Sequence, residues 1–426
     1  MTTKINNEHN KLNFSSEREQ SQACLNSAEH EKNQGRKVLN VPNLRFPEFQ
    51  GEWEESTIGE EFDLYSGNTP SRLNKEHFNG AINWISSGEL KEHYIADTKE
   101  KISDEAAKTL KMLPIGTFVI AIYGLEADGV RGTGSITKTE ATISQACMAF
   151  ISKGKVQNEF LYSWYKKHGN VIGIRYAQGT KQQNLSYDII EKFKIAYPTF
   201  QEQEKLNKFI ALLDERIATQ NKIIEDLKKL KSAIIEIEYT PNTKTTSHIG
   251  NVIEQISKRN KNNAIQNVLS VSNRQGFIKQ SDQFENRNVA SEDTSNYKIV
   301  EKNDFAFNPA RINVGSIARL TTFEKGIISP MYICFRTQEN VAPEYIDFFF
   351  ESKHFYCEIQ KRLEGSVRQC LSFEGLCNIP FSLPSLEMQQ RIGKRLFTLG
   401  QKIKTETDLL ELLNKQKQYL LSQMFI

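Results

Sequence analysis

The feature that most constrains this chain of 426 residues is an internal repeat. When the sequence is shifted by 186 residues, Gly179…Leu185-Ser186 falls on Gly365…Leu371-Ser372, and Pro198…Gln203 falls on Pro384…Gln389. The pattern after each proline then stays in register to the end of the chain. Self-similarity at a fixed shift indicates one structural unit used twice, so we expect two related halves.

Each half ends in a segment with the apolar spacing of a paired long helix. A four–three spacing selects nine positions per half, and seven of the nine are apolar in both. The predicted seam residues are Leu206, Ile210, Leu213, Ile217, Ile224 and Leu227 in the first half and Ile392, Leu396, Leu399, Ile403, Leu410 and Leu413 in the second. The polar exceptions match, Gln220 with Glu406 and Lys231 with Lys417. Such matching argues against two unrelated amphipathic helices and predicts that residues 198–240 and 384–426 form helices that pack on each other.

The segments before these helices, residues 41–197 and 241–383, are different in kind. They mix short β-like runs with glycine-rich turns and align with each other only in scraps. The strand candidates are Thr117–Tyr123, Ala146–Ile151, Asp304–Phe307 and Met331–Phe335. The predicted fold class is therefore α+β, with two pseudo-repeated mixed α/β globules that are each followed by a long helix.

Composition excludes several classes of protein. The longest apolar stretches fall far short of the ~20 residues that a membrane span needs, so we expect no transmembrane helix. Residues 1–40 lack the apolar core of a secretory signal and are predicted to be a disordered polar tail. Six scattered cysteines without a signal indicate a reducing, cytoplasmic setting. A net charge of +3 neither requires nor forbids a nucleic-acid partner.

The motifs of common catalytic and metal sites are missing from the sequence. It has no G-x-x-x-x-G-K-[ST], G-x-G-x-x-G, G-x-S-x-G or C-x-x-C, and its seven histidines are dispersed. Asn308-Pro309 is only the first half of the turn that amino-methyltransferases place against a flipped base. Glu351-Ser352-Lys353 matches a nuclease-like E-x-K, and Asp347 lies one helical turn before it within the run Tyr345–Phe355. We expect Asp347 and Glu351 to line a solvated helix face there. The sequence thus predicts no catalytic residue, no metal site and no cofactor in this chain.

A duplicated chain of this kind suits a scaffold that presents two reading heads to DNA. Arg and Lys read guanine, Asn and Gln read adenine, and contacts to phosphates set the register. Loops with such side chains recur in both globules. The candidate DNA-contacting residues are Ser86, Ser87, Arg131, Lys181, Gln182, Gln183 and Asn184 in the first half, and Asn273, Arg274, Asn308, Arg311, Asn313, Arg368 and Gln369 in the second.

The chain resembles the specificity (S) subunits of type I restriction–modification systems. The resemblance is carried by Val41-Pro42-Asn43-Leu44-Arg45-Phe46-Pro47, by the two turns that end in Leu185-Ser186 and Leu371-Ser372, and by the two proline–glutamine helix starts. It covers nearly everything from residue 40 onward. The chain departs from the pattern at Met388, where the motif has an acid.

The resemblance implies that each globule is a target recognition domain for one half of a split double-stranded DNA sequence. The two helices would form an antiparallel coiled coil that sets the gap between the half-sites. Two methyltransferase subunits carrying S-adenosylmethionine, and restriction subunits using ATP and Mg, would bind this chain, which itself catalyses nothing. The alternative is a duplicated coiled-coil adaptor that joins protein partners and does not bind DNA; only DNA contacts would make binding fall steeply with salt.

Overall fold

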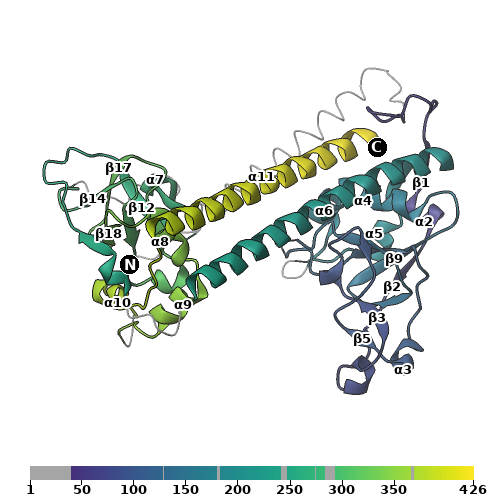
Figure 1. Cartoon of the computed structure of the whole chain (residues 1–426). Coiled ribbons are helices and arrows are strands. Elements are labelled where there is room, and N and C mark those ends of the chain that lie inside the picture. The colour runs from purple at the N-terminus through teal and green to yellow at the C-terminus, as the bar shows by residue number, and fades with distance from the viewer. Residues whose placement is uncertain are drawn as a thin grey trace, which may run out of the picture. The chain divides into compact units, whose positions relative to one another are not determined.

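The computed structural model describes residues 40–127, 129–179, 183–240, 247–273, 275–283, 293–365 and 369–426. The chain forms two compact units (Figure 1). Unit 1 comprises residues up to 217 together with residues 412–426, and unit 2 comprises residues 218–411. All of the predicted polar tail except Asn40 lies outside the described residues.

Unit 1 is built on a five-stranded sheet of order β2-β9-β6-β7-β4 and a three-stranded sheet of order β5-β3-β8, with β1 and β10 paired separately. Its strands are β1 Glu54–Thr57, β2 Phe62–Ser66, β3 Ile82–Ile85, β4 Tyr94–Ile95, β5 Lys101–Ile102, β6 Phe118–Ala121, β7 Gly134–Thr137, β8 Ala141–Ile143, β9 Cys147–Ser152 and β10 Lys194–Tyr197. Its shorter helices are α2 Ile58–Glu61, η2 Lys75–Phe78, η3 Ser87–Glu89, α3 Asp104–Ala107, α4 Asn158–Tyr176 and α5 Tyr187–Ile190.

The core of unit 1 forms around β6. Its four residues, Phe-Val-Ile-Ala, are all apolar and all buried, as expected for a strand covered on both faces. Helix α4 packs against β6, β7 and β9 and buries Phe160, Leu161 and Tyr162 in the same cluster. This packing holds the loop that follows β6 beside α4, which matters for the site described below.

Unit 2 has two four-stranded sheets, of order β11-β18-β15-β16 and β13-β12-β17-β14. Its strands are β11 Ile253–Ile256, β12 Val268–Ser272, β13 Gly276–Lys279, β14 Lys298–Glu301, β15 Phe305–Phe307, β16 Ile317–Arg319, β17 Lys325–Ile328 and β18 Ile333–Thr337. Its shorter helices are η4 Ile249–Asn251, α7 Gln280–Gln283, η5 Ile312–Val314, α8 Pro343–Phe349, α9 Lys353–Gln360 and α10 Phe373–Cys377.

The two units share one strand topology although their sequences align only in scraps. The order β2-β9-β6-β7 recurs as β11-β18-β15-β16, with every pair antiparallel. The order β5-β3-β8 recurs as β13-β12-β17, with one antiparallel and one parallel pair in each. The α+β prediction with two repeated globules is confirmed, and the four strand candidates contain or overlap β6, β9, β15 and β18.

The long helices are α6, Phe200–Tyr239, and α11, Leu386–Met424, and they pack together as predicted. In unit 1, Leu206 near the start of α6 shares a core with Leu421 near the end of α11. In unit 2, Ile234 near the end of α6 shares a core with Ile392 near the start of α11. The helices therefore run antiparallel. The buried seam positions are Leu206, Ile210, Ile224, Ile392 and Leu396, and the half-buried ones are Leu213, Ile217, Leu227, Leu399, Ile403, Leu410 and Leu413.

The repeated proline–glutamine motif is a joint between each globule and the helix that follows it. The side chain of Gln203 donates to Pro198 O and accepts from the backbone N–H of Gln157, both at 2.9 Å. Gln389 donates to Pro384 O and accepts from the N–H of Ala342, again at 2.9 Å. Both glutamines are fully buried, so the motif satisfies backbone groups that would otherwise be buried without partners.

The departure at Met388 has a structural explanation. Its counterpart Glu202 is buried and forms a two-pronged ion pair with Arg45, at 2.8 and 2.7 Å. Arg45 belongs to the Val41–Pro47 segment, which occurs once in the chain. The second half has no such segment, so an apolar residue replaces the acid there.

The expectation that Asp347 and Glu351 line one solvated helix face is wrong in part. The run from Tyr345 to Phe355 is not one helix, since α8 ends at Phe349 and α9 begins at Lys353. Asp347 is only partly exposed: it contacts Arg319 at 3.1 Å, and burial raises its pKa despite that cation. Glu351 is exposed, but it pairs with Lys231 of α6. These acids therefore tie α8 and the residues after it to β16 and α6.

Candidate nucleic-acid interface

The candidate DNA-contacting residues lie on loops that occupy equivalent places in the two units. One pair of loops follows β3 and β12 and holds Ser86, Ser87 and Asn273. A second pair follows β6 and β15 and holds Arg131 in unit 1, and Asn308, Arg311 and Asn313 in unit 2. A third pair lies at the bridges Gln178–Asn184 and Glu364–Cys370, called the hairpins below, and holds Gln183, Asn184 and Gln369. Lys181, Gln182, Arg274 and Arg368 lie outside the described residues.

The hairpin is joined to the β6 loop in unit 1, and the equivalent pair is joined in unit 2. In unit 1 the N–H of Leu185 donates to Ile122 O at 2.9 Å. In unit 2 the N–H of Leu371 donates to Pro309 O at 3.0 Å. The repeated Gly…Leu-Ser turn thus brings the hairpin next to the loop after β6 in unit 1 and next to the loop after β15 in unit 2. Leu185 and Leu371 are fully buried and fix the hairpins to the cores.

In unit 1 this junction brings Arg131 and Gln183 together. Arg131 Nη2 donates to Gln183 Oε1 at 3.3 Å, across 52 residues of chain. The backbone of Gln183 is held by Glu126, whose Oε2 accepts its N–H at 2.8 Å, and by the N–H of Leu125 at 3.0 Å. The hydrogen bond from Gln183, with the nearby Arg131 charge adding to it, lowers the pKa of Glu126. Glu126 is a supporting residue that the sequence did not single out.

Two polar side-chain atoms at this junction are buried without a hydrogen-bond partner among the described residues. They are Arg131 Nε and Asn184 Oδ1. The backbone of Asn184 closes the hairpin through mutual hydrogen bonds with Gln178, at 2.8 and 2.9 Å. Buried polar groups of this kind are uncommon in folded proteins, and these two are among several in the described part of the chain.

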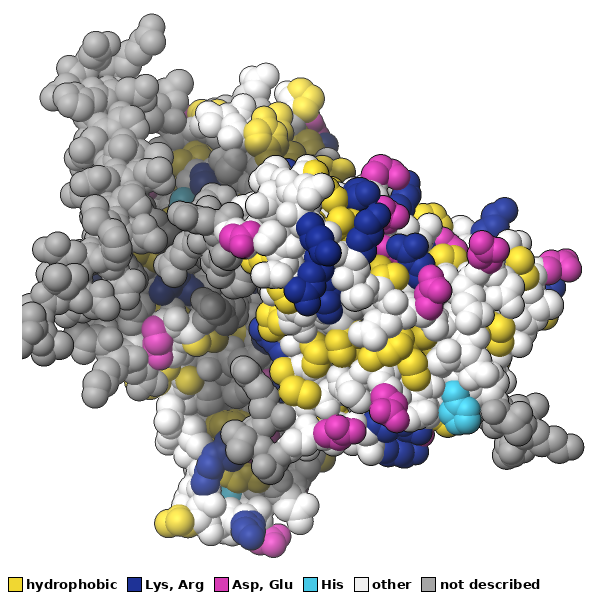
Figure 2. All heavy atoms as spheres, turned by 90° about the vertical axis from the view of Figure 1, so that its left-hand side faces the viewer, with side chains coloured by type: hydrophobic (Ala, Val, Ile, Leu, Met, Phe, Trp, Pro, Cys, Tyr) yellow, Lys and Arg dark blue, Asp and Glu magenta, His cyan; other side chains and the backbone are white. Residues whose placement is uncertain are grey.

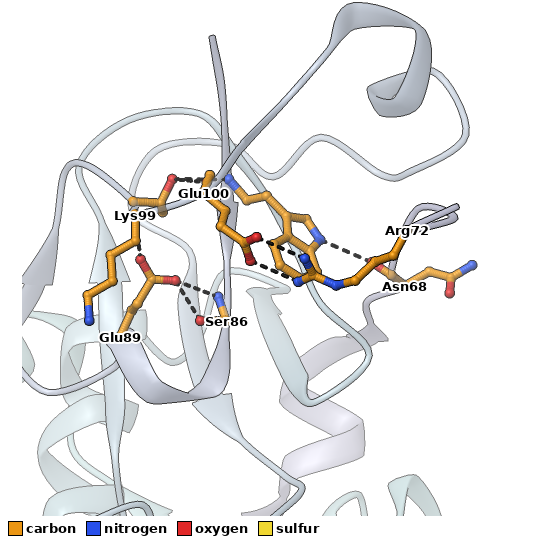
Figure 3. Close-up of polar contacts among 8 residues, drawn as sticks. Asn68, Arg72, Ser86, Glu89, Lys99 and Glu100 are labelled. Carbon is orange, nitrogen blue, oxygen red and sulfur yellow. Dashed lines mark hydrogen bonds and ion pairs between the residues drawn. The ribbon is translucent and has the colours of Figure 1, made fainter. Parts of the chain in front are cut away.

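Hydrogen bonds within the protein hold the β3 loop of unit 1 (Figure 3). The N–H and hydroxyl of Ser86 donate to Glu89 Oε2 at 2.9 and 2.7 Å, and Glu89 Oε1 accepts the N–H of Lys99 at 2.7 Å. Ser86 thereby caps η3, a sufficient reason for a serine here. Ser87, the next residue, is half-buried.

A second cluster in Figure 3 stiffens the loop that follows β2. Arg72 forms two hydrogen bonds to the carboxylate of Glu100, both at 2.8 Å, and lies over the rings of Phe78 and Trp84. The indole of Trp84 donates to Asn68 O at 3.2 Å. These contacts occupy the guanidinium of Arg72 within the protein.

The corresponding residues of unit 2 surround η5. Asn308 is buried, and its Oδ1 accepts the N–H of Ala310 at 3.1 Å, so it stabilises the turn. Arg311 and Gln369 are exposed, and Asn313 is half-buried. On the β12 loop Asn273 is exposed. Arg311, Asn273 and Gln369 are thus the side chains of this set that solvent reaches most freely.

Basic side chains do not form one continuous patch on the face shown in Figure 2, where Lys and Arg lie among Asp and Glu. In unit 2 several of them are paired, such as Lys302 with Glu324 at 2.5 Å and Lys325 with Glu301 at 2.9 Å. Binding of a polyanion would therefore depend on particular loops more than on a uniformly positive face.

The described part of the chain holds no cluster of metal-ligating side chains, and its two buried cysteines are unreactive. It contains no group of three or more His, Cys, Asp or Glu residues able to hold a metal ion. Burial raises the pKa of Cys147 and of Cys334 to about 12, so both thiols stay protonated at neutral pH. Every helix among the described residues is too short or too polar to cross a lipid bilayer.

Comparison with known proteins decides the family. The sequence pattern of the type I restriction modification DNA specificity domain matches residues 50–229 and matches again over residues 234–415. The chain belongs to this family. Each match spans one globule and runs into the long helix that follows it, and the second match begins at residue 234, near the end of α6. The family domain therefore follows the repeat. The resemblance inferred from the sequence motifs is confirmed.

Individual relatives agree. The chain is 30% identical over 192 residues to the EcoR124I/EcoR124II specificity subunit of Escherichia coli, an alignment that covers 44% of this chain and 46% of that protein. It is 22% identical over 408 residues to the MjaVIII specificity subunit of Methanocaldococcus jannaschii, covering 88% and 90%. The alignments with the E. coli protein and with the MjaIX specificity subunit of M. jannaschii span less than half of those relatives.

Solved structures show the same fold. The S subunit of a type I restriction–modification system from M. genitalium superposes with a TM-score of 0.58 at 16% identity, covering 91% of this chain and 99% of that one. A chain from a structural study of complex assembly in the type I system superposes with a TM-score of 0.51 at 14% identity, covering 88% and 97%. At these identities the likeness concerns the fold alone.

Proposed function

We propose that this chain is the DNA sequence-specificity subunit of a type I restriction–modification complex. Units 1 and 2 each read one half of a split double-stranded target, and α6 and α11 set the spacing between the half-sites. The observation that carries the proposal is the duplicated interface. Equivalent loops, joined by equivalent backbone hydrogen bonds, present Arg131 and Gln183 in unit 1 and Arg311 and Gln369 in unit 2. Side chains of these types donate hydrogen bonds to base edges.

In this proposal catalysis belongs to other subunits. Two methyltransferase subunits bind the chain and carry S-adenosylmethionine, and restriction subunits supply ATP- and Mg-dependent cleavage. The relatives named above are specificity subunits, and the family supports a division of labour in which the partners hold the cofactors. A cytoplasmic location follows from this role.

A base-resolution map of adenine methylation tests the proposal. A restriction-deficient bacterium would express this chain together with the methyltransferase subunit encoded beside it, and a control would express that subunit alone. We expect a new split motif that is methylated only when this chain is present. A co-purifying complex that adds no methylation, has no affinity for DNA and holds together independently of salt would instead favour the coiled-coil adaptor without DNA binding.

A further inference from the structure

Arg131 lies against a surface of α4 formed by Gly169 and Gly173, the glycine surface. A Cβ atom on Gly173 would come within 2.5 Å of Arg131 Cγ and 3.0 Å of its Cδ, so the arginine stem occupies the space of a missing side chain. A Cβ on Gly132 would lie 3.0 Å from Asn170 N, and one on Gly169 would lie 3.0 Å from Gly132 Cα. Gly169 and Gly173 together therefore let the β6 loop lie directly on the helix.

The two glycines of this surface lower the stability of α4. A glycine inside a helix destabilises it by about 1 kcal/mol relative to alanine, and α4 holds two of them one turn apart. Both face the Arg131–Gly132 segment. The two glycines fix the orientation of the Arg131 side chain. An arginine that only neutralised a phosphate would not need a fixed orientation.

The pair of Arg131 and Gln183 presents hydrogen-bond donors. Gln183 Oε1 already accepts from Arg131, which leaves the side-chain amide of Gln183 with its N–H groups. The guanidinium of Arg131 carries only hydrogen-bond donors. Among the base pairs, guanine is the base that offers two neighbouring acceptors, N7 and O6, in the major groove.

We infer that Arg131, held by Gly173 and by Gln183, reads a guanine in the half-site recognised by unit 1. This inference rests on the proposed function and adds to it a named base type, a residue that reads it and two residues that position it. Glu126 supports the same pair by holding the backbone of Gln183.

The test uses the full chain, expressed with the adjacent methyltransferase subunit and mapped by adenine methylation. Arg131→Lys keeps the charge but removes the planar fork that fits guanine. Gly173→Ala keeps the arginine but fills the space in which its stem lies. Gly400→Ala is the matched control, because Gly400 is also inside a helix and an added Cβ there would meet nothing within 4 Å.

We expect Arg131→Lys to make one guanine position of one half-site degenerate, with discrimination at that position reduced about 10- to 100-fold and the other half-site unchanged. Gly173→Ala should relax the same position, while Gly400→Ala should give the wild-type motif. Unfolding temperatures of Gly173→Ala and Gly400→Ala at or above the wild-type value would show that relaxation is not a loss of fold, since both changes favour helix.

Three results would overturn the inference. The first is full discrimination in Arg131→Lys. The second is methylation that falls evenly at all sites with the motif intact, which is the signature of a phosphate contact. The third is relaxation in the half-site that does not depend on unit 1. A wild-type chain that confers no split motif would overturn the proposed function as well, so the two failures are distinguishable.

Discussion

At the scale of single residues, one cluster of polar contacts in unit 1 lies where its globule meets both long helices. His93 lies between the rings of Tyr94 and Tyr162, at centroid distances of 4.1 and 4.0 Å. Its Nδ1 is 2.8 Å from Asp214 Oδ2 of α6, and the other oxygen of Asp214 pairs with Lys417 of α11. One carboxylate thus contacts the globule and the second helix at once, so its charge state matters for unit 1.

Asp214 makes the free energy of unfolding depend on pH. Burial disfavours its charge, but the contact with His93 and the charge of Lys417 outweigh burial and lower its pKa. Because the pKa is lower in the folded chain, the stabilisation is present above the unfolded value of about 3.9 and is lost as the pH falls through the folded value.

We therefore expect Asp214→Asn to lower the free energy of unfolding by about 1.5–3 kcal/mol at pH 7. The difference between wild type and variant should shrink below about pH 4. Denaturant unfolding across this pH range measures it, and a difference independent of pH would mean that the charge of Asp214 is not what stabilises the junction.

The glutamine joints give a second prediction at this scale. Gln203→Leu removes the partner of the N–H of Gln157 and of the carbonyls of Pro198 and Lys155. Gln389→Leu does the same to the N–H of Ala342 and the carbonyl of Pro384. Each change should cost about 2–4 kcal/mol in unfolding free energy, because a buried orphan group costs about 1–3 kcal/mol. Thermal unfolding of the two variants should show similar losses. A loss in only one of them would show that the motif is not a shared joint.

At the scale of elements, the long helices are where the sequence is most informative. Their apolar spacing continues over many turns, and a seam of that length has few alternative structures. The polar positions are informative as well. Gln220 donates to the side chain and the backbone carbonyl of Glu406, and the two residues are 186 positions apart, which is the shift of the repeat. A residue that contacts its own repeat equivalent shows that the helices are related by a local two-fold at this point.

This polar pair should fix the alignment of the helices at some cost in stability. Gln220→Leu alone leaves the buried Glu406 carboxylate with one contact fewer and should destabilise the chain. Gln220→Leu combined with Glu406→Leu should raise the unfolding free energy above wild type by about 1–2 kcal/mol. Denaturant unfolding of the two single variants and the double variant measures the coupling. Additive effects would show that the two side chains do not act as a pair.

The globules were harder to predict from the sequence, for a physical reason. Their sheets have one topology, but short strands tolerate many apolar sequences, so strand equivalence survives where sequence similarity does not. The site shows the same limit. Arg131 and Gln183 were both candidates, but their contact spans 52 residues and could not be read from either loop. Gly169 and Gly173 were missed, although two glycines one turn apart inside a helix are a signal of close backbone approach.

At the scale of the whole molecule, the proposed function requires two units that read DNA independently. Each unit has its own core and its own junction of loops. Replacing residues 41–197 with the corresponding segment of another specificity subunit should therefore change one half-site of the methylated motif and leave the other unchanged. A methylation map of the chimera measures this, and a change in both half-sites would contradict independent reading.

The spacing of the half-sites is the property that belongs to the whole chain. Helix α6 has 40 residues, about 60 Å at 1.5 Å per residue. One heptad is about 10 Å, which corresponds to about three base pairs of DNA at 3.4 Å each. Removing a heptad keeps the apolar seam facing the partner helix, because seven residues are close to two full turns.

The most direct test of the account is the deletion of one heptad from both α6 and α11, followed by a base-resolution methylation map. We expect both half-sites to keep their sequence while the unspecified spacer between them becomes about three base pairs shorter. An unchanged spacer would contradict the central claim, because the helices would then not set the distance at which the two units read DNA.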